Sequence, residues 1–176
     1  MSGGIHIRPA KAKDAALIGH VFHQAWRETY RGLLPDDIVD GLQADTVAEE
    51  WAAKLAPDGG SFCLLAETGA GAPIGFGGGA ILPAPEDGCD GLLDSLYFLK
   101  GHHGGGLGRE LVRRIAANLS AAGATRMKVV VLASNPALEF YKRLGAEVIL
   151  ERERLHRGHL CPEVVLAWSL PLSSAP

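Results

Sequence analysis

The sequence predicts a mixed α/β (α+β) fold, in which helices cover the faces of a sheet. The first observation is the order of patterns along the chain: strand-like and helical segments follow one another as β-α-α-β-β-β-α-β-α-β-β. The second is that the sequence contains no internal repeat and no linker between these segments. We therefore expect residues 1–176 to form a single domain, with flexible ends at 1–4 and 171–176.

The first third of the chain predicts one strand and two helices. Residues 5–8 alternate as a short strand, and Asp14 can cap a helix whose apolar residues recur at helical spacing as far as Tyr30. No helix is expected from there to Thr46. At that residue the capping box Thr-Val-Ala-Glu predicts the start of the second helix.

The rest of the chain predicts a hairpin, two strands that each lead into a helix, and a final hairpin. Residues 62–67 and 74–82 flank a turn-rich stretch and predict the first hairpin, whereas 83–88 is expected to be an exposed loop. The other expected elements are the strand 92–99, a helix from Leu107 that Gly123 closes, the strand 127–132, a short helix capped by Asn135, and the strands 147–154 and 163–170.

Composition and charge argue against several classes of protein. The 176 residues suffice for one compact domain, and 17 Lys plus Arg against 20 Asp plus Glu give a net charge of -3, without the basic excess of a nucleic-acid binder. The cysteines, Cys63, Cys89 and Cys161, are odd in number and widely spaced, so they fit neither a disulfide framework nor a zinc site. The sequence shows no signal peptide and no membrane-spanning apolar stretch, which favours a cytoplasmic protein without a membrane partner.

A glycine-rich turn joins the predicted strand 92–99 to the next helix. It reads His103-Gly104-Gly105-Gly106-Leu107-Gly108 and leads into a helix with one apolar face. Main-chain N–H groups at a helix start have no helical partner, and the helix dipole adds positive charge, so the turn is suited to a pyrophosphate. A plain connecting turn that binds nothing is the alternative.

Two common phosphate-binding patterns do not fit this turn. No Lys-Ser or Lys-Thr follows the glycines, and Arg109 stands where the dinucleotide pattern Gly-x-Gly-x-x-Gly needs its third glycine. The turn instead resembles the Gln/Arg-x-x-Gly-x-Gly/Ala motif of the GNAT-family N-acetyltransferases, with His103 in place of Gln or Arg. A second stretch, from Asn135 through Tyr141 to Gly145, resembles that family's Asn-x-x-Ala-x-x-x-Tyr-x-x-x-Gly-Phe motif, and the resemblance extends over nearly the whole chain.

The resemblance implies a fold, a co-substrate and a set of binding residues. The fold would be a mostly antiparallel mixed sheet of about six to seven strands, flanked by four helices. The co-substrate would be acetyl-CoA without a metal, and the histidines also lack metal-like spacing. The residues implied in binding acetyl-CoA are Leu96, Tyr97 and Phe98 on the strand, His103, Gly104, Gly105, Gly106, Leu107, Gly108 and Arg109 in the turn, and Asn135.

The resemblance also assigns catalysis to Tyr141, whose phenol would protonate the departing thiolate. An aromatic side chain that only packs in the core is the other interpretation, just as Asn135 is equally well a plain helix cap. Family members often carry a glutamate as general base at the position of Leu92. Because Asp94 lies two residues on and faces the same side of the strand, it is our candidate for a proton relay.

Other polar and aromatic side chains near the motifs also have two interpretations. Trp26 and Tyr30 share one helical face, which is more typical of a core than of substrate contacts. Arg113 and Arg114 are more typical of a solvated helix face. Arg109, at the helix start, is the better candidate for a phosphate ligand.

Together these observations predict an acetyl-CoA-dependent N-acetyltransferase that moves the acetyl group directly to an amine. The alternative is a non-catalytic acyl-CoA-binding or regulatory module on the same fold, which the leucine at position 92 favours slightly. An interaction domain that has lost CoA is a third hypothesis. The acceptor would be a small-molecule or peptide amine of open identity, and a homodimer through the carboxyl-terminal strands is compatible with the sequence.

Overall fold

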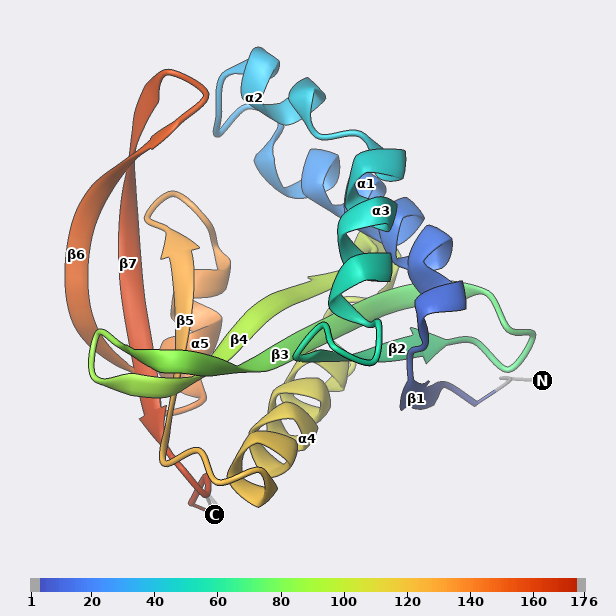
Figure 1. Ribbon diagram of the computed structural model, residues 1–176. Helices are drawn as coiled ribbons and strands as arrows, with labels where there is room; N and C mark the ends of the chain where they lie inside the picture. Colours follow the sequence, from blue (N-terminus) through green and yellow to red (C-terminus); the bar gives the residue numbers. More distant parts are fainter. Residues whose placement is uncertain (1–3, 174–176) are drawn as a thin grey trace.

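One seven-stranded sheet in the order β1-β2-β3-β4-β5-β7-β6 forms the centre of the molecule (Figure 1). The computed structural model describes residues 4–173, so residues 1–3 and 174–176 of the predicted flexible ends 1–4 and 171–176 lie outside the described residues. The strands are β1 His6–Pro9, β2 Ser61–Glu67, β3 Pro73–Glu86, β4 Cys89–Phe98, β5 Arg126–Leu132, β6 Glu147–His156 and β7 His159–Ser169. Neighbouring strands are antiparallel except for β4 and β5. The predicted mixed, mostly antiparallel sheet is confirmed, while the single domain stays a prediction.

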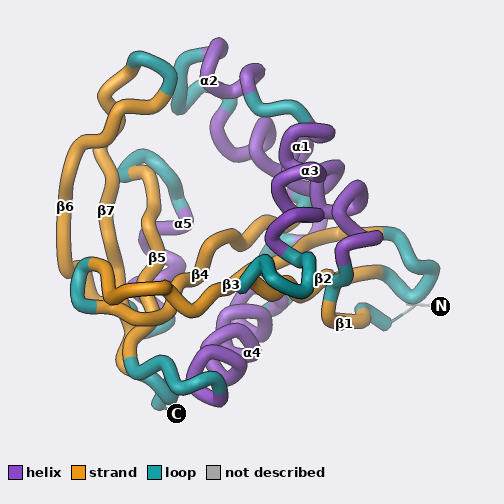
Figure 2. The backbone as a smooth tube through the Cα atoms, in the orientation of Figure 1, coloured by secondary structure: helices purple, strands orange, loops and turns teal. Residues whose placement is uncertain are grey.

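Helices cover both faces of this sheet (Figure 2). The described residues form the α-helices α1 Ala15–Tyr30, α2 Asp36–Gly41, α3 Ala44–Lys54, α4 Leu107–Ala121 and α5 Ala137–Arg143. Helices α1 and α3 pack on one face, and α4 and α5 on the other. Among the described helices, none is long and apolar enough to cross a membrane.

The two faces carry two separate apolar cores, and sequence periodicity explains each. On α4 the residues Leu111, Ile115 and Leu119 recur at helical spacing and are fully buried against the sheet. On the other face, Ile18 of α1 and Trp51 of α3 pack in a second core. Because one sheet separates the two cores, a strand residue contributes to one or the other according to the side it faces.

The glycines of β3 let helices approach the sheet closely. The six-membered ring of Trp51 occupies the space that a Cβ of Gly78 would take. On the other face, Ile115 approaches the Cα of Gly77 in the same way. The glycine cluster that begins at residue 69 therefore serves helix packing inside the strand, in addition to forming a turn before it.

Asp14 does not cap α1, contrary to the prediction. Its carboxylate accepts hydrogen bonds from Arg8 Nη1 and Nη2, at 2.9 and 3.0 Å, and from the main-chain N–H of Lys11, at 2.8 Å. A charged guanidinium is a stronger donor than the N–H groups at the helix start. The hydrogen bonds from Arg8 outweigh the effect of burial and lower the pKa of Asp14 to about 2.

Three predicted boundaries in the first half of the chain were wrong. Helix α2 was missed, although Pro35 and the acidic first turn after it favour a helix start. Helix α3 begins at Ala44, so that Thr46 lies inside the first turn and does not cap it. The predicted loop 83–88 instead extends β3 to Glu86. The hairpin closes over Asp87 and Gly88, both with positive φ, as in a tight two-residue turn.

Candidate functional site

The strands β4 and β5 separate along their length and open a wedge in the sheet. Their parallel pairing is confined to Gly91 with Met127 and Leu92 with Lys128. Beyond these pairs, the main chain of β4 that follows Leu92 remains paired with β3 and has lost β5 as a neighbour. Main-chain hydrogen-bonding groups of the described strands therefore face the wedge and can bind a ligand that enters it.

A β-bulge at Asp94 bends β4 just after its last residue paired with β5, where the wedge opens. Ser95 pairs with Gly78 and Leu93 pairs with Gly79, so Asp94 is an extra residue on its strand. The carboxylate of Asp94 points to the α3 side, where Lys54 Nζ contacts Oδ2 at 2.7 Å.

The bulge also determines how the three predicted strand residues are oriented. Leu93 and Leu96 both pack in the α4 core although they are three residues apart, because the bulge reverses the alternation. Phe98 faces the α4 core too, whereas Tyr97 packs between Phe22 and Phe76 on the α1 side. These side chains are occupied in packing, which leaves the main chain to face the wedge.

The predicted glycine turn lies at the end of β4 and presents unpaired donors. Gly104 and Gly106 have φ of 84° and 79°, a conformation that side-chain-bearing residues rarely adopt. Gly106 precedes the first residue of α4, and no side chain caps that helix. No described residue accepts a hydrogen bond from the main-chain N–H groups of residues 104–109. The turn therefore combines free donors with the positive end of the α4 dipole.

His103 anchors the turn to the strand before it. Its Nε2 lies 2.9 Å from the carbonyl oxygen of Phe98 and, since a carbonyl only accepts, donates this hydrogen bond. Glu28 of α1 accepts the main-chain N–H of Lys100 at 2.8 Å. Although burial opposes its ionisation, hydrogen bonds from Gln24 and Lys100 lower the pKa of Glu28. His103, which departs from the family motif, thus holds the turn against β4 through its own contact with Phe98.

Tyr141 lies on α5 with an almost fully buried ring. The ring packs edge-on against Phe140 and Trp168, with centroids 5.2 and 5.8 Å away. No described residue forms a hydrogen bond with its hydroxyl. Among the described residues, however, every side-chain nitrogen or oxygen that is closed off from solvent has a hydrogen-bond partner. The hydroxyl must therefore reach accessible space. Burial raises the pKa of Tyr141 above its usual value, so that the phenol stays protonated at neutral pH.

Asn135 connects the start of α5 to α1. Its Oδ1 accepts the main-chain N–H of Ala137 at 2.8 Å, as a helix cap would, and its Nδ2 donates to the Tyr30 hydroxyl at 2.6 Å. Burial raises the pKa of Tyr30 to about 12. Tyr30 is thus a buried residue, as predicted, but its hydroxyl also joins two segments on either side of the wedge.

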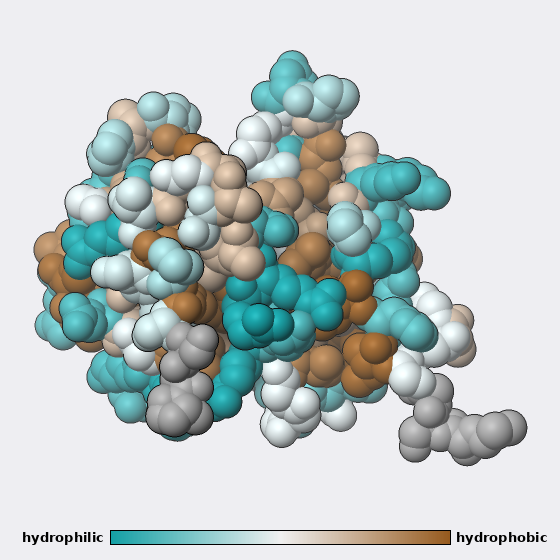
Figure 3. Space-filling model, turned by 90° about the horizontal axis from the view of Figure 1, so that it is seen from below, coloured by the Kyte–Doolittle hydropathy of each residue, from teal (hydrophilic) through white to brown (hydrophobic). Residues whose placement is uncertain are grey.

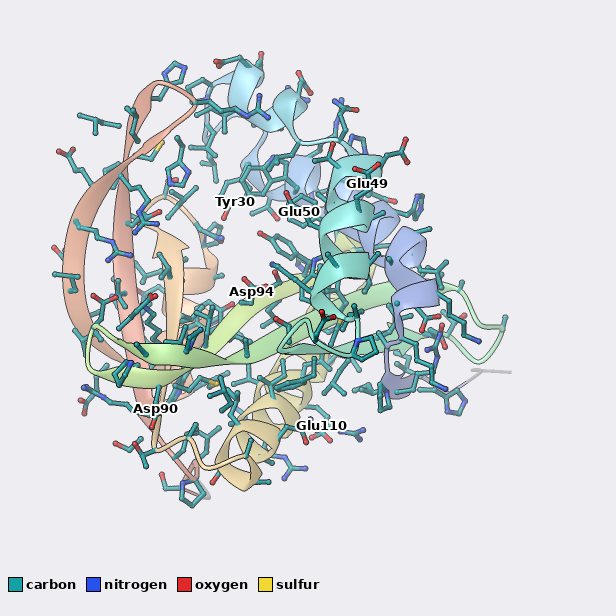
Figure 4. The ribbon with its side chains drawn as sticks, in the orientation of Figure 1. Tyr30, Glu49, Glu50, Asp90, Asp94 and Glu110 are labelled. Atoms are coloured by element: carbon teal, nitrogen blue, oxygen red, sulfur yellow. The ribbon has the colours of Figure 1, made fainter. Side chains whose placement is uncertain are left out.

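The surroundings of Tyr97 on the α1 side of β4 perturb its phenol. Burial raises the pKa of Tyr97 well above its usual value, and the nearby Tyr30, Tyr141 and Asp94 add to this rise in that order. Figure 4 shows Tyr30 and Asp94 on the same side of the sheet, the side of α1 and α3. Asp94 thus lies on the α3 face and Tyr141 packs in the α4 core, and among the described residues no hydrogen bond or ion pair joins these two predicted catalytic residues.

The arginines on α4 differ in their surroundings. Arg113 and Arg114 form exposed ion pairs with Glu110, and hydrophilic side chains gather over α4 in the view of Figure 3. Arg109 forms no ion pair with any described residue. It lines a groove of about 800 Å³ together with Arg113, Arg126 and Arg143. Arg109 therefore remains the better candidate for a phosphate ligand.

A cavity of about 280 Å³ lies between α1–α2 and the β6–β7 hairpin. Apolar residues form part of its wall and polar residues the rest; they are Trp26, Leu34, Ile38, Val130, Leu132, Arg154, His156, Cys161 and Glu163. Sequence reasoning missed Arg154 and Glu163 in this role. The signal was the alternation Arg152-x-Arg154-x-His156, which places the three side chains on one face of a strand. No group of three or more potential metal ligands occurs among residues 4–173.

Sequence comparison relates the chain to acetyltransferases. The profile of the family described as "Acetyltransferase (GNAT) family" matches residues 19–146, most of the chain. A curated relative, the uncharacterized N-acetyltransferase YuaI of Bacillus subtilis (strain 168), is 29% identical over 164 residues, which cover 93% of this chain and 92% of the relative.

Solved structures with the same fold include several acetyltransferases. The PaiA N-acetyltransferase from Thermoplasma acidophilum, in complex with coenzyme A, aligns with a TM-score of 0.73 at 17% identity and covers 94% of this chain and 99% of its own. YncA, a putative acetyltransferase from Salmonella typhimurium with its cofactor acetyl-CoA, aligns with a TM-score of 0.71 at 20% identity, covering 98% of each chain. An acetyltransferase from Thermus thermophilus reaches 0.67 at 26% identity, over 97% of this chain and all of its own.

Proposed function

Because the chain belongs to the GNAT family of acetyltransferases, we propose that it transfers an acetyl group from acetyl-CoA directly to a primary amine. The observation that carries the proposal is the row of main-chain N–H groups at 104–109 that have no acceptor among the described residues. These donors lie at the end of β4, where the wedge between β4 and β5 opens. Two solved relatives of the same fold are described with coenzyme A or acetyl-CoA bound.

The residues around the wedge fit acetyl-CoA in charge and shape. The pyrophosphate would accept hydrogen bonds from the main-chain N–H groups of residues 104–109, with the Arg109 side chain and the α4 dipole neutralising its charge. The pantetheine arm would lie along the main chain of Leu96, Tyr97 and Phe98, with Asn135 on the β5 side. Bound there, acetyl-CoA supplies a thioester, whose acetyl carbon is activated for attack by an amine.

Tyr141 is suited to act as the general acid. Its hydroxyl is protonated at neutral pH because burial raises its pKa, and it forms no hydrogen bond with a described residue that would compete for its proton. In the reaction, the amine nitrogen bonds to the acetyl carbon and the carbon–sulfur bond breaks. Tyr141 would donate its proton to the departing sulfur, so that the free thiol leaves.

Asp94 is our candidate for the proton relay on the amine side. The acceptor must lose a proton before it attacks, and Asp94 is a carboxylate on the strand β4, which borders the wedge on the α3 side. The ion pair with Lys54 fixes the orientation of this carboxylate. Positioning of both reactants in the wedge would contribute the larger part of the rate, as in other reactions between two bound substrates.

Release of free thiol from acetyl-CoA, measured with a broad panel of primary amines, tests this function. We expect thiol release that requires both an amine and the enzyme, with the N-acetyl product identified by mass spectrometry. Loss of thiol release in Tyr141→Phe, with unchanged affinity for CoA in calorimetry, would assign the activity to this site.

A non-catalytic acyl-CoA-binding module is the second candidate. The observation that favours it is Leu92 in place of the usual family glutamate, together with the engagement of Asp94 by Lys54. Calorimetry separates the candidates: binding of CoA without thiol release for any amine supports the module. If CoA does not bind at all, both candidates fail.

A further inference from the structure

We infer, on the basis of the proposed acetyl transfer, that the acceptor is a small apolar amine bearing a carboxylate, and that Arg154 binds this carboxylate. The inference starts from the cavity between α1–α2 and the β6–β7 hairpin, on the same side of the sheet as Tyr30 and Asp94 (Figure 4). Its walls combine an apolar surface with one group of charged side chains. Each property restricts the acceptor in a different way.

Glu163 is the buried centre of the charged wall. Its side chain is 6% exposed, and it accepts hydrogen bonds from His156 Nε2 at 2.8 Å and from Arg152 Nε at 3.3 Å. Arg152 also faces Asp87 at 3.5 Å. These contacts satisfy the one carboxylate that lines the cavity. The Glu163 carboxylate is therefore hydrogen-bonded without Arg154. An acceptor that enters the cavity does not meet an unpaired negative charge at Glu163.

Arg154 is the cation of this wall with unused hydrogen-bonding capacity. Its Nε lies 3.6 Å from Glu163 Oε2, beyond hydrogen-bond distance, and its side chain is 59% exposed. No described residue accepts a hydrogen bond from its two terminal nitrogens. A guanidinium with both terminal nitrogens free matches the two oxygens of a carboxylate.

The opposite wall fits the apolar body of the acceptor. Trp26, Leu34 and Ile38 approach from α1 and α2, and Val130 and Leu132 from β5. The indole N–H of Trp26 donates to the carbonyl of Val39 at 3.2 Å, so the ring is held in place and presents its apolar surface. An acceptor with an aliphatic or aromatic side chain gains from burial here, whereas a polycation does not.

The hairpin closes the cavity against large acceptors. At the tip of β6–β7, Arg157 Nη2 donates to the carbonyl of Gly41 at 2.7 Å, and His159 Nε2 lies 3.1 Å from Asp37 Oδ2. Figure 1 shows this tip beside α2, so the two walls form an arch. A volume of about 280 Å³ lies just below the range usual for small-molecule sites, which favours a small acceptor.

Matched acceptors test the inference. Thiol release is measured with leucine, phenylalanine and methionine, each beside the decarboxylated amine of the same side chain, and with a peptide amino terminus. We expect kcat/KM to be about 10- to 100-fold higher for at least one amino acid than for its decarboxylated partner, as a charged hydrogen bond predicts. Arg154→Met should lower kcat/KM for the amino acid far more than for its decarboxylated partner, so that the preference disappears.

Two further variants make the test specific. Arg154→Lys keeps the positive charge but loses the two parallel N–H donors of the guanidinium, so part of the preference for the amino acid should remain. Arg114→Met on α4 should leave this preference unchanged. Equal rates for both members of every pair, a preference for the peptide, or an equal loss for both acceptors in Arg154→Met overturns the inference. If no amine at all releases thiol, the proposed acetyl transfer itself fails, which is a distinguishable result.

Discussion

The Nδ2 of Asn135 donates a 2.6 Å hydrogen bond to the hydroxyl of Tyr30, and this bond links residues that are 105 positions apart. It joins α1, which forms one wall of the acceptor cavity, to the start of α5, which carries Tyr141. Because Oδ1 of the same amide caps α5, a change at either end of the bond affects both walls of the site.

The first prediction concerns this bond. Tyr30→Phe should lower the free energy of unfolding by about 1 kcal/mol, and Asn135→Ala by more, since it also removes the cap. The double variant should show a coupling energy of about 1 kcal/mol in denaturant unfolding. Strictly additive effects would mean that the bond does not form in solution.

The second prediction concerns the general acid. Tyr141→Phe should lower kcat at least about 100-fold while the dissociation constant for CoA stays unchanged. Since burial raises the pKa of Tyr141, its hydroxyl keeps its proton through the physiological range. The proton is lost only at a pH above the usual tyrosine pKa. Rates of the wild-type enzyme should therefore not fall between pH 7 and 9 through this group. A descending limb in that range that disappears in Tyr141→Phe would contradict the raised pKa, whereas an unchanged kcat in Tyr141→Phe would contradict the general-acid role.

The third prediction concerns the glycine turn. Gly106→Glu should abolish binding of CoA in calorimetry, because it places a side chain at a φ of 79° and a negative charge beside the phosphates. Gly101→Glu is the matched control, since that glycine has no positive φ and open space around it. Equal affinities for CoA in both variants would show that the phosphates bind elsewhere.

The fourth prediction concerns the proton relay. Asp94→Asn should lower kcat at least about 10-fold and alter the pH–rate profile, because the acceptor then lacks its proton relay. Lys54→Met keeps the carboxylate and removes its 2.7 Å contact, so activity should fall less than in Asp94→Asn. A pH–rate profile that Asp94→Asn leaves unchanged would show that water or another group takes the proton.

The fifth prediction concerns stability against acid. The pKa of Asp14 is lowered from 3.8 to about 2, so its pairing with Arg8 stabilises the fold above pH 3.8 and this stabilisation is lost as the pH falls toward 2. Asp14→Asn should therefore cost about 2 kcal/mol of unfolding free energy at pH 7 and much less at pH 2, where about half of the folded-state carboxyl is protonated. The exposed Asp58→Asn should show no such pH-dependent difference. A constant loss for Asp14→Asn across this range would point to packing and not to charge.

Sequence patterns located the elements of the second half of the chain with small errors. The apolar stripe of α4 and the continuous strand β5 are local signals, because each depends on residues that are close in sequence. The errors fell where local signals competed. Asp14 has the chemistry of a cap, but Arg8 lies close enough in the folded chain to bind its carboxylate. The bulge at Asp94 has no local signature, because it arises from the register with β3.

By itself, the sequence determined the glycine turn: a glycine-rich segment between a strand and an amphipathic helix leaves the N–H groups at the helix start without helical partners. The cavity between α1–α2 and the β6–β7 hairpin was decided only by the tertiary structure. Arg154, Trp26 and Val130 come from distant segments, and the alternation on β6 says which residues share a face but not what that face meets. Main-chain donors follow from local conformation, whereas a cavity depends on how strands and helices pack across the molecule.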